Sequence, residues 1–103
     1  MPTIEVRTDH QLPAAEAVER LRLFGETLKQ KHGDEVEIIK EQWHDQTLDF
    51  SLAAKGITIE GELVVEDDQA LVRCRLPFAA MLFRGRIEND IQKTLRAALA
   101  DPT

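Results

Sequence analysis

The chain has 103 residues, the size of one small domain, so one hydrophobic core is expected over residues 1–103. Hydrophobic residues make up 43% and charged residues 31% of the chain, a balance that excludes disordered and collagen-like polypeptides. Residues 1–70 hold 7 basic and 16 acidic residues, a net charge of −9. Residues 71–103 hold 6 basic and 3 acidic residues, a net charge of +3, so the whole chain carries −6. Because an acidic surface repels phosphate, we expect no nucleic-acid partner.

Targeting segments and cysteine chemistry are not indicated. The longest apolar run, Leu76–Phe83, has eight residues including a proline, which is too short to cross a membrane. The first residues lack the basic segment and apolar core of a secretory signal. Cys74 is the one cysteine, so neither an internal disulfide nor a cysteine-based zinc site is expected. These features predict a cytoplasmic protein.

A strand and a helix are predicted in the first third of the chain. Residues 3–8 alternate between apolar and polar side chains, the pattern of a half-buried strand. From Ala14, directly after Pro13, apolar side chains recur every three or four positions, at Ala17, Val18, Leu21, Phe24 and Leu28. This spacing predicts an amphipathic helix, which Gly33 is expected to end in a left-handed conformation.

Four short strands are predicted next. They cover Val36–Trp43, Thr47–Ala53, Ile57–Glu66 and Ala70–Leu76. Turn-forming residues separate them, and connections this short require antiparallel neighbours. Gly61 lies in the middle of a strand, where glycine indicates either a bulge or the close approach of another element.

A second helix is predicted at the end of the chain from the apolar stripe Ile87, Ile91, Leu95 and Ala98. It begins either near Phe78 or after Gly85, because Arg84-Gly85-Arg86 would suit a break. The order β-α-β-β-β-β-α predicts an α+β fold of two layers. Both helices should cover one face of a curved antiparallel sheet.

Three segments resemble the polyhydroxyalkanoic acid system family, small bacterial proteins grouped by their association with polyester granule gene regions. They are His10-Gln11-Leu12-Pro13, Thr58-Ile59-Glu60-Gly61 and the stretch from Leu82 to Glu88. The resemblance implies a bacterial cytoplasmic setting and an accessory role near polyhydroxyalkanoate storage. It provides no catalytic residues to transfer. The architecture is also similar to a shortened helix-grip fold of the START-like lipid-transfer kind.

The polar residues give no pattern of a catalytic or metal site. His32 and His44 fall at a helix end and in a turn, and no histidines or carboxylates stand at ligand spacing. His10, in the loop before the first helix, is assigned a structural or capping role in preference to an exposed functional one. Glycine-rich phosphate loops, Gly-x-Ser-x-Gly motifs and tyrosines are absent, and Cys74 has no neighbouring base. We therefore expect no enzyme, no cofactor and no metal ion.

The aromatic side chains, including Trp43, Phe78 and Phe83, are expected in the core of so small a domain. The run Pro77–Phe83 is nevertheless apolar on nearly every side, more than a one-faced helix requires. Part of this run is therefore either buried by a second contact or exposed as a partner surface, and both alternatives stay open.

Arginines flank the apolar run on both sides, which suggests a candidate interaction surface. The set consists of Phe78, Leu82, Phe83, Arg84, Arg86, Arg73 and Arg75. The first interpretation of Arg73 and Arg75 is ion pairing with Glu60 and Glu62 on the neighbouring strand. The alternative is a cationic rim around an apolar patch.

Two classes of function remain. The first is a non-enzymatic accessory or interaction protein that acts at the surface of polyhydroxyalkanoate granules or on granule proteins. The alternative is a small carrier that binds an apolar or acyl ligand between the C-terminal helix and the sheet. A homodimer is a further candidate assembly.

Overall fold

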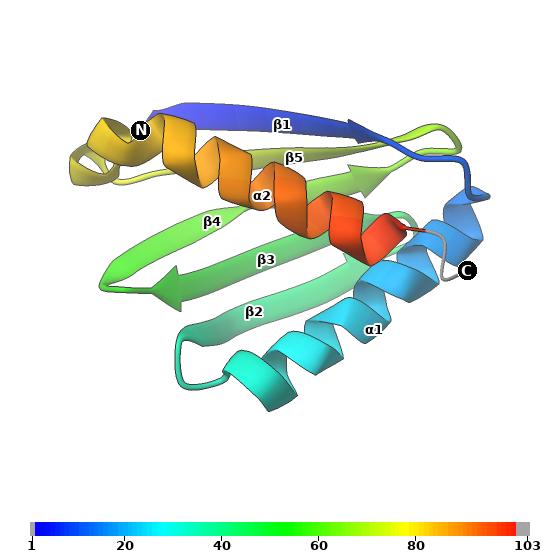
Figure 1. Cartoon of the computed structure of the whole chain (residues 1–103), viewed down its shortest axis with the longest axis horizontal. Coiled ribbons are helices and arrows are strands. Elements are labelled where there is room, and N and C mark those ends of the chain that lie inside the picture. The colour runs from blue at the N-terminus through cyan, green and yellow to red at the C-terminus, as the bar shows by residue number, and fades with distance from the viewer. Residues whose placement is uncertain (1, 101–103) are drawn as a thin grey trace.

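Two helices cover one face of a five-stranded antiparallel sheet in the computed structural model, which describes residues 2–100 (Figure 1). The elements are β1 (Thr3–Asp9), α1 (Ala14–His32), β2 (Val36–His44), β3 (Thr47–Ala54), β4 (Ile57–Val65), β5 (Gln69–Arg75), the 3-10 helix η1 (Phe78–Phe83) and α2 (Arg84–Leu99). The strands lie in the order β1-β5-β4-β3-β2, and every neighbouring pair is antiparallel. The predicted α+β fold class is therefore confirmed.

The helices and the inner face of the sheet enclose the core. Along β1, Ile4 and Val6 point inward and are opposite Cys74 and Val72 of β5. This alternation continues into β4, and the buried apolar residues form one cluster with the first half of α1 and the second half of α2. Within residues 2–100, no helix has the length and apolar character needed to cross a bilayer.

Burial is uneven between the two ends of the helix layer. Figure 1 shows the end of α2 close to the start of α1, and from there the two helices diverge across the sheet. α1 contains no buried side chain after Val18, and β2 contains none at all. The inward-facing side chains beneath the diverging helices, such as Ile38 and Leu52, are half-buried. We call this region the open end.

Gly33 does not have the left-handed conformation that was expected of it. Its φ of −60° and ψ of −23° continue the right-handed helix, so that expectation is wrong. A Cβ atom at this position would lie 2.7 Å from the carbonyl oxygen of Lys29. Glycine is therefore needed here for a close backbone approach and not for a positive φ.

Gly61 permits a close approach between strands. A Cβ atom there would lie 2.2 Å from the carbonyl oxygen of Arg73. Pairing continues through Gly61 on both sides, to Phe50 of β3 and Cys74 of β5, so no bulge occurs at this position. An irregularity does occur in the edge strand β2, between Ile38 and Lys40.

The final helix begins between the two positions that the sequence left open. η1 occupies Phe78–Phe83, and α2 then runs from Arg84, so Gly85 lies inside its first turn. The interruption is therefore a change from 3-10 to α-helical geometry that comes before Arg84.

Candidate interaction surface

Buried Leu76 and extended Pro77 position η1 immediately after the sheet. The N–H of Leu76 donates to the carbonyl of Pro2 at 2.9 Å, which continues the pairing of β5 with β1. Pro77, with φ −60° and ψ 151°, redirects the chain, and the N–H of Ala80 donates to its carbonyl at 3.0 Å. Sequence and geometry agree here, because a proline fixes its own φ at the value that this turn requires.

Only part of the apolar run reaches the core. Ala80 is buried and Met81 packs against the core cluster, whereas Phe78, Leu82 and Phe83 are 85%, 87% and 56% exposed. The expectation that Phe78 and Phe83 lie in the core is therefore wrong. The six residues of η1 lie at the end of the sheet, where only Ala80 and Met81 contact the core and the larger side chains stay at the surface.

Two arginines directly follow these three exposed side chains at the start of α2. The Nε atom of Arg84 lies 2.9 Å from Oε1 of Glu88, one turn further along the helix. Arg86 is exposed and makes no ion pair within residues 2–100. We call Phe78, Leu82, Phe83, Arg84 and Arg86 together the η1 patch.

Arg73 and Arg75 lie on the outer face of the sheet, away from both helices. Arg73 is 3.3 Å from Glu5 and 3.7 Å from Glu62, and Arg75 is 3.7 Å from Glu60. The ion-pair interpretation of these two arginines is therefore confirmed. They are held by neighbouring strands, and the η1 patch is formed without them.

His10 joins two loops. Its Nε2 atom lies 2.7 Å from the carbonyl oxygen of Glu66, and its Nδ1 atom accepts the N–H of Leu12 at 3.1 Å. With Nδ1 as acceptor, the proton of the neutral ring is assigned to Nε2, which donates to Glu66. The predicted structural role of His10 is confirmed.

The N-terminus of α1 receives its capping bond from a residue that the sequence did not indicate. The N–H of Ala14 donates to Oδ1 of Asp67, in the β4–β5 turn, at 3.3 Å. Pro13 makes no side-chain cap. Asp67 lies 53 positions after Ala14 in the sequence, so no local capping motif indicates this bond.

The remaining histidines and the cysteine do not contribute to a metal site in the described part of the chain. Within residues 2–100, no three His, Cys, Asp or Glu side chains come close enough to hold a metal ion. His32 is exposed in the last turn of α1, and His44 lies 3.6 Å from Asp49 across the β2–β3 hairpin. Cys74 is buried, and this burial raises the pKa of its thiol to about 11.

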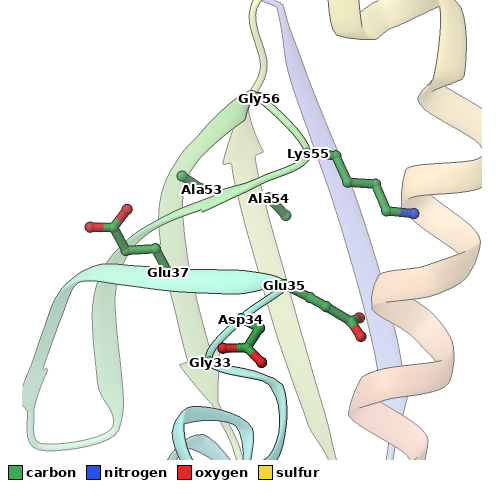
Figure 2. A pocket seen from close by; sticks show the side chains of 8 residues that line it. All are labelled: Gly33, Asp34, Glu35, Glu37, Ala53, Ala54, Lys55 and Gly56. Carbon is green, nitrogen blue, oxygen red and sulfur yellow. The ribbon is translucent and has the colours of Figure 1, made fainter.

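Two open pockets with mainly polar linings lie on the surface, and neither lies between α2 and the sheet. One, of about 360 Å³, lies where the α1–β2 connection meets the β3–β4 turn. Figure 2 shows the side chains of Glu35 and Glu37 in this pocket pointing to opposite sides, so the carboxylates do not converge. The other, of about 330 Å³, lies over the outer-face ion pairs of Arg73 and Arg75.

The resemblance noted in the sequence is supported by comparison with family models. The model described as "Putative polyhydroxyalkanoic acid system protein" matches residues 4–99. The chain belongs to this family. No curated protein matches the chain.

The fold is similar to that of solved structures with very different sequences. The crystal structure of Ara h 8.0201 aligns with a TM-score of 0.54 at 13% identity, over 97% of this chain and 99% of that chain. TTHA0849 from Thermus thermophilus aligns with a TM-score of 0.45 at 15% identity, over 95% and 94%. The first similarity identifies the architecture as a helix-grip fold. At such low identity it carries information about the fold alone.

Proposed function

We propose that this member of the polyhydroxyalkanoic acid system family is a non-enzymatic accessory protein that docks on polyhydroxyalkanoate granules in the bacterial cytoplasm. Docking uses the η1 patch, and the occupant is the polyester surface or a protein that coats it. The family assignment supports the setting. The exposure of Phe78 and Leu82 supports the contact.

The observation that carries this proposal is the exposure of three large apolar side chains within the six residues of η1. Scattered exposed apolar residues are ordinary, but a contiguous group marks an interaction surface. Arg84 and Arg86 add positive charge beside the group in a protein of net charge −6. Burial of the apolar side chains would supply affinity, and the arginines would orient the protein toward acidic groups on the partner.

The test is co-sedimentation of the purified protein with granules. We expect Leu82→Asp combined with Phe83→Asp to reduce the bound fraction at least tenfold, since two charges would enter the contact. The fold should be retained, because both side chains are largely exposed. A matched control is Leu23→Asp combined with Ile39→Asp, which changes two other exposed apolar residues in α1 and β2 and should bind normally.

Further arms of this experiment separate the candidate occupants. Arg84→Glu combined with Arg86→Glu should make the residual binding less sensitive to salt, because screened attraction no longer contributes. Binding to protein-free polyester particles assigns the contact to the polymer, and binding to native granules alone assigns it to a coat protein. Normal binding by the Leu82/Phe83 variant contradicts the proposal, and so does the loss of its fold.

The open end of the helix layer supports a second candidate, a carrier for an apolar or acyl ligand. Apolar side chains on the inner face of the sheet there, at Ile38, Leu52 and Ile59, are only half-buried. An acyl chain seated between the helices and the sheet would complete their burial.

A carrier should retain its ligand during purification. We expect mass spectrometry of the denatured protein to detect a lipid or acyl compound, and an excess of that compound to raise the melting temperature of the native protein. Protein that is free of bound compounds, and whose melting temperature does not respond to added fatty acids, contradicts this second candidate.

A further inference from the structure

The outer edge of β1 presents backbone groups that the sheet does not use. The carbonyl of Pro2 accepts the N–H of Leu76, and the N–H of His10 donates to the carbonyl of Asp68. These bonds place the backbone groups of even-numbered β1 residues toward β5. The N–H and C=O groups of Glu5, Arg7 and Asp9 therefore point away from the sheet.

β1 is also the more regular of the two sheet edges. Its seven residues pair with β5 without a shift in register. β2, at the opposite edge, has an irregularity between Ile38 and Lys40, and Ile39 beside it is 56% exposed. Bulges of this kind hinder a strand from pairing with another chain, and β1 contains no bulge.

The side chains of β1 are complementary to a second copy of themselves in one antiparallel register. With Val6 on the two-fold axis, Glu5 of each copy lies opposite Arg7 of the other, and these are the residues whose backbone groups face outward. A shift by two residues in either direction puts Glu5 opposite Glu5 or Arg7 opposite Arg7. Like charges directly opposite are destabilising, so the charges select the first register.

On the outer face of the sheet, a row of alternating charges already leads up to Glu5. Arg73 lies between Glu62 at 3.7 Å and Glu5 at 3.3 Å, so charges alternate across β4, β5 and β1. Arg7 is opposite Leu71 of β5 and makes no ion pair within residues 2–100. In the selected register, Arg7 of the second copy would be the next member of this alternating row.

We propose that two copies of this chain associate through their β1 edges, with Glu5 of each copy opposite Arg7 of the other, to form a continuous ten-stranded sheet. The inference is independent of the granule proposal. One side chain opposes it, because Nε2 of Gln92 donates to the Arg7 carbonyl at 2.9 Å and lies 3.2 Å from the Thr8 hydroxyl. Association must release this bond, so the dimer is weak and reversible.

Sedimentation equilibrium of the full chain tests this pairing, over concentrations from about 10 μM to about 1 mM. We expect wild-type protein to dimerise in this range. Glu5→Arg alone and Arg7→Glu alone should each weaken dimerisation at least tenfold, because like charges then face each other twice. An equimolar mixture of the two variants should form the heterodimer, and the double variant should recover the homodimer.

Two further variants serve as control and as a test of direction. Glu62→Arg removes an ion pair of Arg73, as Glu5→Arg does, but Glu62 lies on β4, away from the β1 edge. This variant should leave dimerisation unchanged. Gln92→Ala frees the Arg7 carbonyl and should strengthen it. A wild-type protein that stays monomeric at about 1 mM overturns the proposal. A dimer that ignores the charge reversals and is lost in Leu82→Asp overturns it too, since its contact is then the η1 patch.

Discussion

Cys74 couples the stability of the protein to alkaline pH. Its thiol is buried on the inner face of β5, and burial raises its pKa from 9.0 to about 11. Between these two values the unfolded state loses the proton while the folded state keeps it. Stability contributed by the protonated thiol is therefore complete below about pH 9 and declines above it, by up to roughly 1.4 kcal/mol per pH unit.

Urea unfolding at a series of pH values from about 8 to about 10.5 measures this effect. We expect the free energy of unfolding of the wild type to fall more steeply above about pH 9 than that of Cys74→Ala, which lacks the titrating group. Thiol reagents should label native Cys74 slowly for the same reason. Parallel pH profiles, or rapid labelling of the native protein, would show that the thiol is accessible.

At the scale of secondary structure, α2 depends on the face that carries Ile91. This side chain is half-buried and packs against the core cluster, in line with buried Leu95 and Leu99. Ile91→Asp should lower the free energy of unfolding by about 2 to 4 kcal/mol, because it moves a carboxylate toward the core. Thermal or urea denaturation measures the loss.

The neighbouring Lys93→Asp variant provides the control for Ile91→Asp. Lys93 is on the same helix but exposed, so its replacement should change the free energy of unfolding by less than about 0.5 kcal/mol. Equal effects of the two substitutions would mean that the assignment of the buried face of α2 is incorrect.

Most elements were predictable because their signals are local. The alternation around Ile4 and Val6 defines β1, and the apolar spacing after Pro13 defines α1 with the bounds that the structure has. The turn at Lys55 and Gly56 is equally local, since both residues have positive φ, 53° and 77°. In each case a few neighbouring residues contain all the information that the prediction needs.

Features that depend on distant residues were not predictable. The carboxylate that bonds the start of α1 belongs to Asp67, and the partner of His10 is the carbonyl of Glu66. Gly33 keeps a right-handed conformation, and glycine is needed there because a Cβ atom would be too close to the Lys29 carbonyl oxygen. Such contacts form only once the β4–β5 turn and the helix end have been positioned by the whole fold.

The candidate surface was predictable in composition but not in orientation. The sequence identifies Pro77–Phe83 as too apolar for a one-faced helix. Whether Phe78 or Ala80 faces the core depends on the 3-10 geometry of η1, which the apolar pattern does not determine. The acidic partners of Arg73 and Arg75 were predictable, because period-two alternation places Glu60 and Glu62 on the same outer face.

For the whole molecule, the structure separates four of the six basic residues in the C-terminal third into two places. Arg73 and Arg75 join the ion pairs of the outer sheet face, whereas Arg84 and Arg86 lie at the start of α2. The positive charge of these four arginines is thus split between a row of ion pairs and the η1 patch, while Lys93 and Arg96 lie further along α2.

The divergence of the two helices also affects how the molecule unfolds. The second half of α1, together with β2 and β3, has Ser51 as its one buried side chain. β1, β4, β5 and the second half of α2 contribute most of the buried apolar cluster. Regions with few buried apolar contacts open at a lower free energy than the global transition. We therefore expect the β2–β3 hairpin and the end of α1 to open as a unit while β1, β4, β5 and α2 stay folded, which native-state hydrogen exchange would detect as earlier exchange of their amides.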